Sequence, residues 1–116
     1  LMDRIKEFEL YDIVMDHNEI VMGYSAGALV QLAEYHISPD DDYPDFKYCK
    51  GFPFLSDFYI EFHYESTSVQ TAAINRVLTE RGKKMYAVKP NAGALLVDNG
   101  EIHPIGNVQI FENIQE

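Results

Sequence analysis

The sequence predicts an α/β fold in which a parallel sheet has helices on both faces. Three observations carry this prediction: short apolar runs alternate with helical segments, a serine flanked by glycines follows the first run, and an Asn-Gly pair separates two strand-like segments. Strands that alternate with helices require right-handed crossovers and build a parallel sheet, to which the last hairpin adds an antiparallel ribbon. The 116 residues, 47% of them apolar, suit a single domain, 1–116, with a hydrophobic core.

The N-terminal half is expected to contain helix, strand, helix and loop in that order. Met2–Ile13 has a ragged helical face. Ile20–Tyr24 is a short apolar run typical of a buried parallel strand, and Ala28–Tyr35 after it is expected to be helical. Ile37–Gly51 contains two prolines and four aspartates, so we expect a long loop there.

The C-terminal half contains the clearest pattern. Phe58–His63 is the next apolar strand. Ser66–Arg81 has one apolar helical face, with a Ser or Thr cap at its start and Gly82 to end it. The remaining strands are expected at Met85–Val88, at the hairpin of Ala94–Val97 and Glu101–His103 around Asn99-Gly100, and at Val108–Phe111.

Composition narrows the classes of partner and cofactor. The formal net charge of −10 argues against nucleic acid, because an acidic surface repels phosphates. No apolar run approaches the ~20 residues that span a bilayer, so we expect no membrane insertion. Cys49 is the single cysteine, which excludes an internal disulfide and fits a cytoplasmic protein. Without a cysteine pair or a His-x-x-x-His pair, we expect no metal and no cofactor.

A nucleophile motif follows the first apolar run. Gly23–Gly27 reads Gly-Tyr-Ser-Ala-Gly and matches the G-x-S-x-G elbow, which places a serine on a strained strand-to-helix turn. Both glycines are expected to be required, because larger side chains would collide across the turn. The N–H of Ala26 is expected to face the place where an oxyanion would develop beside Ser25. The alternative is a tight turn with an ordinary serine cap.

Ser25 needs a base, because a hydroxyl is a poor nucleophile at neutral pH. The chain has four histidines, at positions 17, 36, 63 and 103. His63 ends a predicted strand at the carboxyl edge of the sheet, which is the edge where Ser25 is expected. The other three histidines occupy the opposite edge, the far end of a helix and the hairpin. We therefore predict that Ser25 and His63 emerge side by side from adjacent parallel strands.

A carboxylate that fixes the histidine tautomer is expected in the loop between the two residues. Its candidates are Asp40, Asp41 and Asp42, any of which could reach the imidazole. Glu61 shares a strand face with the histidine but lies back toward the sheet. Glu34 is expected on the elbow helix and is less favoured.

Three segments together resemble the peptidase S51 family, which includes dipeptidase E (alpha-aspartyl dipeptidase) and cyanophycinase. They are the string Gly23–Ala28, the aspartate-rich loop and the strand end Phe62–Tyr64. The interval of 38 positions between serine and histidine (63 − 25) fits this family and argues against α/β-hydrolases, whose histidine lies far downstream. The segment Asn91–Gly100 is similar to the closing hairpin of the family.

The resemblance implies a class I glutamine amidotransferase-like (flavodoxin-like) fold and a serine peptidase that hydrolyses small peptides next to an aspartyl residue. It implies that Ser25 is the nucleophile and His63 the general base. The acid falls at Asp40 by its spacing from the serine, or at Asp41 by its spacing from the histidine. The arginines lie on predicted helices, so none is placed to bind an acidic substrate.

The resemblance also implies that this chain is the C-terminal part of such a domain, without the N-terminal strands and the second oxyanion donor. Loss of one donor typically costs ~100–1000-fold in rate, so we expect a weakly active or inactive chain. An exposed sheet edge invites pairing with a second copy, so we expect a dimer. Two other interpretations are a non-catalytic amidotransferase-like binding protein and a general serine esterase.

Overall fold

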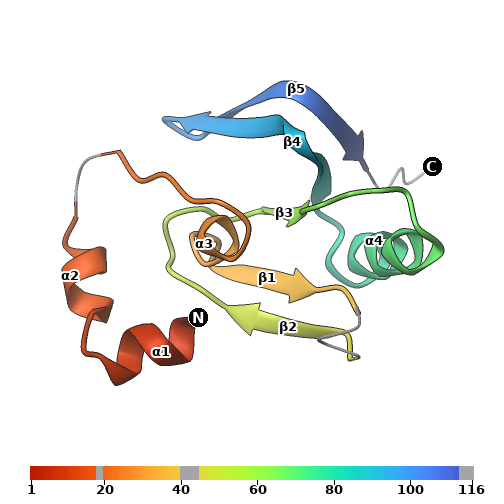
Figure 1. Ribbon diagram of the computed structural model, residues 1–116. Coiled ribbons are helices and arrows are strands. Elements are labelled where there is room, and N and C mark those ends of the chain that lie inside the picture. The colour runs from red at the N-terminus through yellow and green to blue at the C-terminus, as the bar shows by residue number, and fades with distance from the viewer. Residues whose placement is uncertain (18–19, 40–44, 113–116) are drawn as a thin grey trace.

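The computed structural model of the chain describes residues 1–17, 20–39 and 45–112 and contains two sheets (Figure 1). A two-stranded antiparallel sheet comes first along the chain, and a three-stranded mixed sheet belongs to the C-terminal half. In chain order the elements are α1 (Met2–Glu7), α2 (Tyr11–Met15), α3 (Ala26–Leu29), β1 (Glu34–Ile37), β2 (Lys47–Lys50), β3 (Phe58–Glu61), α4 (Ser68–Arg81), β4 (Lys84–Asp98) and β5 (Glu101–Phe111).

The three-stranded sheet has the order β3-β4-β5. β3 lies parallel to β4, with Tyr59 opposite Met85. β5 lies antiparallel to β4, with Val108 opposite Val88. The α/β class and the C-terminal antiparallel hairpin are therefore confirmed. The described residues contain one parallel strand pair in place of the larger parallel sheet that the sequence predicted.

β4 and β5 form one long ribbon that bends as it leaves β3 (Figure 1). The register shifts between Val88 and Gly93, so the four short strands predicted for this region are the two halves of each long strand. Asn99 and Gly100 both have positive φ, 50° and 83°, which suits the two-residue turn that joins right-twisted strands.

α4 packs on one face of this sheet and was predicted with its caps. The Thr67 side chain accepts a hydrogen bond from the Gln70 N–H, and Gly82 ends the helix with a left-handed φ of 65°. Its buried side chains Ile74, Val77 and Leu78 share a cluster with Tyr59, Met85 and Ala87. Burying each large apolar side chain contributes ~1.5–3 kcal/mol, which fixes α4 firmly. Within the described ranges, no helix is long and apolar enough to cross a bilayer.

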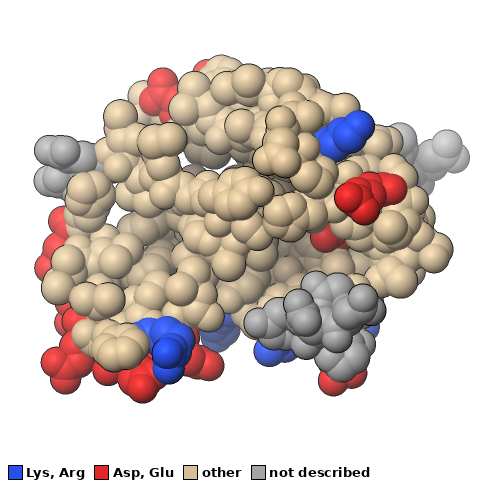
Figure 2. All heavy atoms as spheres, viewed as in Figure 1, with Lys and Arg blue, Asp and Glu red and all other residues tan. Residues whose placement is uncertain are grey.

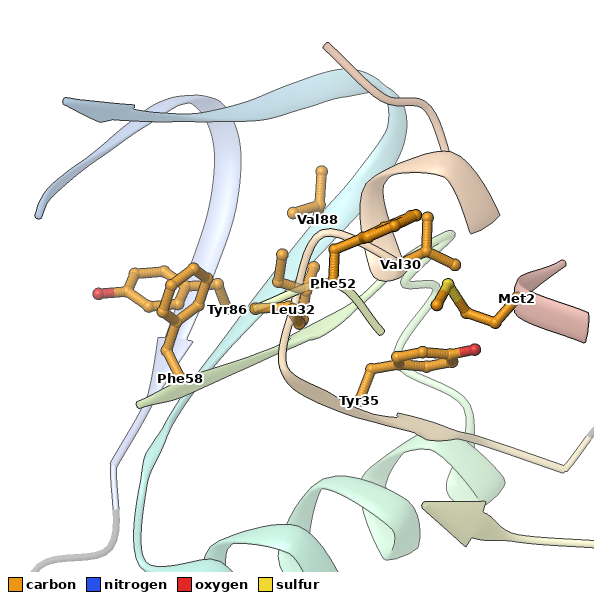
Figure 3. Packing of buried hydrophobic residues seen from close by; sticks show 9 residues of the cluster. Met2, Val30, Leu32, Tyr35, Phe52, Phe58, Tyr86 and Val88 are labelled. Carbon is orange, nitrogen blue, oxygen red and sulfur yellow. The ribbon is translucent and has the colours of Figure 1, made fainter. Parts of the chain in front are cut away.

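The opposite face of β3 and β4 has a buried cluster of its own (Figure 3). Phe58 and Tyr86 face it from the sheet, because successive side chains of a strand point to opposite sides. Met2 from α1 and the fully buried Leu32 and Phe52 pack against them. This cluster lies beneath the segment that carries α3 and therefore supports the nucleophile turn.

The apolar run Ile20–Tyr24 is not a strand, which corrects the sequence prediction. It has no strand partner among the described residues, and Ile20 and Met22 are 86% and 90% exposed. The predicted neighbour of Ile20–Tyr24, β3, is an outer strand of its sheet and pairs only with β4 among the described strands. A parallel strand forms only beside another strand, so apolar composition alone could not place this segment in the sheet.

The predicted helix Ala28–Tyr35 is also wrong, because α3 stops after one turn. The Ala33 N–H donates to the Leu55 carbonyl at 2.8 Å, and Leu32 bridges to Leu55, which pulls the chain out of the helix. The chain continues as β1, which pairs with β2. β2 lies within the segment Ile37–Gly51 that was predicted to be a loop throughout. Tertiary hydrogen bonds here override the local helix propensity.

Candidate active site

Ser25 lies at the turn that leads into α3, and its backbone is strained. Its φ and ψ are 54° and −115°, a region that residues other than glycine rarely occupy. Such strain persists only where the surrounding structure holds it, and it is frequent at sites of chemistry. The sharp elbow predicted around Ser25 is therefore present, although no strand precedes it.

The two glycines of the elbow differ in how tightly they are packed. A Cβ atom on Gly23 would lie 2.3 Å from the Gly27 carbonyl oxygen and 2.6 Å from Nε2 of Gln31. A Cβ on Gly27 would meet nothing within 4 Å. The expectation that both positions must be small is confirmed for Gly23 and wrong for Gly27.

His63 approaches the nucleophile from the loop that follows β3. Its Nε2 lies 3.0 Å from Ser25 Oγ, which is within reach for proton transfer. The next residue, Tyr64, donates its N–H to the Val88 carbonyl at 3.0 Å and holds the loop beside β4. Tyr24 meets the imidazole edge-on, with ring centroids 6.0 Å apart. The predicted adjacency of Ser25 and His63 is confirmed, but the pair comes from a turn and a loop and not from adjacent strands.

The Ala26 N–H is the backbone donor that follows Ser25 in the chain. Gly27 N–H donates to the Tyr24 carbonyl and Ala28 N–H to the Ser25 carbonyl, each at 3.0 Å. In the part of the chain that the structure describes, the Ala26 N–H makes no backbone hydrogen bond. It can therefore donate to a negatively charged oxygen near Ser25. With only four residues in α3, the helix dipole that the longer predicted helix would supply is small.

An open cavity of about 1110 Å³ lies beside these groups. Ser25, Ala26 and His63 line it, and so do three lysines, at positions 6, 47 and 50. The sequence prediction considered only arginines as cations for an acidic substrate. It missed Lys47 and Lys50 because the prolines and aspartates around them predicted a loop where the structure has β2. On the face shown in Figure 2, acidic side chains gather over α1 and α2, and charges are sparse across the middle.

The arginines are engaged away from this cavity, as their predicted helical positions suggested. Arg4 pairs with Glu7, and Arg76 with Glu80. Arg81 pairs with Glu34 at 2.7 Å and covers the ring of Tyr48, with its guanidinium carbon 3.8 Å from the ring centroid. The two contacts of Arg81 fasten α4 to β1 and β2.

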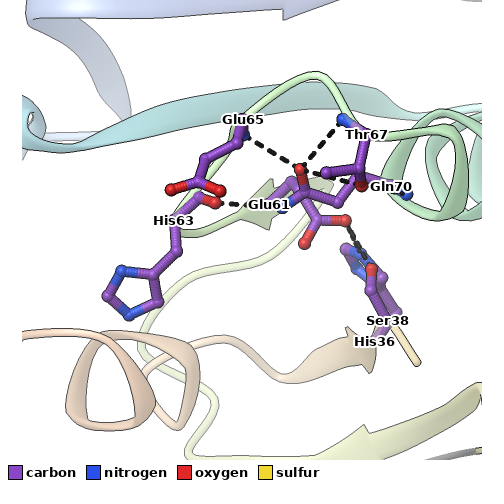
Figure 4. A network of polar contacts seen from close by, with 7 residues as sticks. All are labelled: His36, Ser38, Glu61, His63, Glu65, Thr67 and Gln70. Atoms are coloured by element: carbon purple, nitrogen blue, oxygen red, sulfur yellow. Dashed lines mark hydrogen bonds and ion pairs between the residues drawn. The ribbon is translucent and has the colours of Figure 1, made fainter. Parts of the chain in front are cut away.

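A second polar cluster lies in the wall of the same cavity (Figure 4). Glu61 and His36 are 6% and 2% exposed, and Oε1 of Glu61 lies 3.2 Å from Nε2 of His36. Ser38 Oγ donates to the same oxygen at 2.5 Å. Nδ1 of His36 has no hydrogen-bond partner within the described residues. Glu61 therefore serves this buried cluster, and His36 lies on β1 and not at a helix end as predicted.

The other predicted candidates fall outside the Ser25–His63 pair. Nε2 of His17 lies 3.4 Å from the Ile20 carbonyl oxygen, and His103 on β5 lies 3.5 Å from Glu101. Asp40, Asp41 and Asp42 lie outside the described residues. Glu34 is on β1, where hydrogen bonds from Arg81 and then Tyr59 hold the pKa of its carboxyl below the usual value.

The structure therefore brings together a serine hydroxyl, an imidazole nitrogen and, one residue after the serine, a backbone N–H. Acyl transfer requires groups of these three chemical kinds. Among the described residues, no group of three His, Cys, Asp or Glu side chains could hold a metal ion. Comparison with models of known protein families, with curated proteins and with solved structures yields no significant match for this chain.

Proposed function

We propose that this protein is a serine hydrolase that cleaves small peptides, with Ser25 as nucleophile and His63 as general base. The observation that carries the proposal is the 3.0 Å contact between Ser25 Oγ and His63 Nε2, made by a serine with strained backbone angles. A serine–histidine hydrogen bond at the tip of a strained turn is the arrangement that activates a hydroxyl.

The reaction proceeds in two halves. His63 Nε2 accepts the proton of Ser25 Oγ as the oxygen attacks the peptide carbonyl, and the resulting oxyanion accepts a hydrogen bond from the Ala26 N–H. The imidazolium then protonates the leaving amine, which departs and leaves an acyl-enzyme. Water, deprotonated by the same imidazole, releases the acid. The resemblance to the peptidase S51 family adds Asp40 or Asp41 as the acid that orients His63.

The domain is proposed to be of the class I glutamine amidotransferase-like (flavodoxin-like) type, with this chain as its C-terminal part. The exposed run Ile20–Tyr24 supports this, since its composition suits the centre of a sheet. Among the described residues we assign one oxyanion donor, the Ala26 N–H, so a slow reaction is expected for this chain. The exposed run Ile20–Tyr24 also supports dimerisation, because an extended apolar segment without a strand partner among the described residues can pair with a second copy.

Small peptides with an aspartyl residue are the proposed substrates. Lys47 and Lys50 line the cavity that contains the nucleophile and can attract a substrate carboxylate. These lysines supply the positive charge that no arginine provides among the described residues lining this cavity. A cytoplasmic setting is proposed because Cys49, the single cysteine, is free.

The test is labelling with a fluorophosphonate probe together with hydrolysis of aspartyl dipeptides and p-nitrophenyl acetate. Ser25→Ala should abolish labelling and turnover. Ser38→Ala is the matched control, because this serine lines the same cavity but bonds to a carboxylate and not to an imidazole. Hydrolysis that survives Ser25→Ala would disprove the assignment. Absent labelling of wild type favours a binding protein, and turnover of the ester alone favours a general esterase.

A further inference from the structure

The loop that carries His63 is held in an unfavourable backbone conformation. His63 has a φ of 51° and Ser66 a φ of 58°, both in the left-handed region that favours glycine. His63 is exposed, and the Tyr24 ring that meets its imidazole is exposed as well, so packing around the ring gives this conformation little support. The conformation must be maintained by hydrogen bonds to the loop backbone.

The Tyr64 N–H bonds to the Val88 carbonyl, and one side chain, that of Gln70, makes two further hydrogen bonds to this loop. Nε2 of Gln70 donates to the His63 carbonyl at 3.0 Å, and Oε1 of the same amide accepts the Glu65 N–H at 2.9 Å (Figure 4). Gln70 belongs to the first turn of α4, whose buried face is fixed against β3 and β4. The backbone on either side of Tyr64 is thus tied to a rigid helix through a single amide.

The two ends of that amide have separable roles. Oε1 also accepts the Thr67 N–H at 3.5 Å, and Oγ1 of Thr67 accepts the Gln70 N–H at 3.1 Å, which completes a capping box. Glutamate serves equally well in such a box, because only an acceptor oxygen is required. A carboxylate has no N–H, however, so it could not donate to the His63 carbonyl. The helix cap needs the oxygen of Gln70, and the histidine loop needs its nitrogen.

We propose that Gln70 is a positioning residue for His63: its amide N–H holds the His63 backbone so that the imidazole meets the Ser25 hydroxyl. The inference rests on the proposed function for its catalytic consequence, but the contact itself can be measured without turnover. Displacement of a catalytic group by about 1 Å can cost ~100-fold in rate, so one hydrogen bond to the base's backbone is sufficient to matter.

The variant Gln70→Glu tests this, because it keeps the acceptor of the capping box and removes the donor. We expect kcat to fall by roughly 10- to 100-fold with KM little changed. Ile74→Val, which trims a buried side chain one turn along α4, is the control for lost stability and should retain wild-type kcat. If the new carboxylate acted by changing the pKa of His63, the pH–rate profile would move along the pH axis. Displacement of the base instead lowers the maximal rate of the profile.

NMR separates failure of this inference from failure of the proposed function. The ¹⁵N resonances of the His63 ring are compared in the wild type and in Ser25→Ala, and the difference reports the Ser25–His63 contact. We expect this difference in the wild-type background and its loss in the Gln70→Glu background. Persistence of the difference in Gln70→Glu, or its absence from the wild-type background, overturns the inference. A chain that shows the expected shifts but neither labels nor hydrolyses retains the inference and loses the proposed function.

Discussion

Gly23 packs directly against the backbone of Gly27, so closely that a methyl group on Gly23 would lie 2.3 Å from the Gly27 carbonyl oxygen. That carbonyl also accepts a hydrogen bond from Gln31 at 3.3 Å. The contact closes the turn on which Ser25 lies. The reverse position is open, since nothing lies within 4 Å of a Cβ built on Gly27.

Alanine substitutions at these two glycines should therefore have opposite effects. Gly23→Ala should destabilise the protein by about 1–3 kcal/mol through overpacking, and it should slow labelling of Ser25 by a fluorophosphonate. Gly27→Ala should be neutral or stabilise by up to ~1 kcal/mol, because alanine is the better helix former. Urea denaturation and labelling rates measure both effects, and equal behaviour of the two variants would contradict the packing argument.

Replacement of His63 should remove reactivity without unfolding the protein. His63→Asn is the suitable change, because asparagine tolerates the positive φ of this position. We expect kcat to fall by ~10²–10⁴-fold, the usual contribution of a general base, with stability within ~0.5 kcal/mol of wild type. His103→Asn, on the exposed ribbon, should leave kcat unchanged. Wild-type turnover by His63→Asn would exclude this residue as the base.

The two lysines of β2 should favour acidic substrates. Replacing Lys47 and Lys50 by methionine should raise KM for an aspartyl dipeptide several-fold, since exposed charge pairs contribute ~0.2–1 kcal/mol each, and leave KM for a neutral dipeptide unchanged. Lys83→Met is the control, because this lysine pairs with Asp57 and does not line the cavity. Added salt should reduce the wild-type preference by screening. Equal changes for both dipeptides would argue against charge recognition.

The buried carboxylate of Glu61 should contribute to stability through its hydrogen bonds. Glu61→Ala leaves the imidazole of His36 and the hydroxyl of Ser38 without their acceptor, which should destabilise the fold by about 1–3 kcal/mol. Glu61→Gln keeps an acceptor oxygen and should have a smaller effect. Chemical denaturation of the two variants gives the comparison, and a harmless Glu61→Ala would show that these bonds add little.

Acid should weaken the junction of β1 with α4. Hydrogen bonds from Arg81 and then Tyr59 lower the pKa of Glu34 below 4.5, so its ionised form stabilises the fold above that pH. The contribution is lost as the pH falls through the lowered, folded-state pKa. The difference in unfolding free energy between wild type and Glu34→Gln should therefore be constant above about pH 4.5 and shrink below it. A difference that grows on acidification would have the wrong sign.

Local signals predicted the C-terminal half well. α4 begins at Ser68 after a Thr67 cap and ends at Gly82, because capping depends on residues within a few positions of one another. The Asn99-Gly100 turn is equally local. Ile20–Tyr24 and β1 were assigned wrongly, because pairing depends on which distant strand is present and apolar composition does not reveal that.

The sequence predicted the Ser25–His63 pair of the candidate site but not the residues around it. The elbow motif and the position of His63 at a strand end were sufficient to bring His63 to Ser25. The lysines of β2 and the role of Gln70 depend on contacts between the loops and α4 that have no sequence signature. A Gln in place of the commoner Glu of a capping box is the one local hint, and it is a weak one.

The exposed segment Ile20–Tyr24 allows proteolysis to report whether another strand is bound to it. Proteases bind their targets as extended chain, and this stretch has no strand partner among the described residues and exposes Met22 and Tyr24. Chymotrypsin should cut first after Tyr24, just ahead of the serine, and so separate α1 and α2 from the remainder. Any strand that docks along this segment, from another copy or another chain, would slow that cut, and the digestion rate would measure how much of the protein has the strand bound.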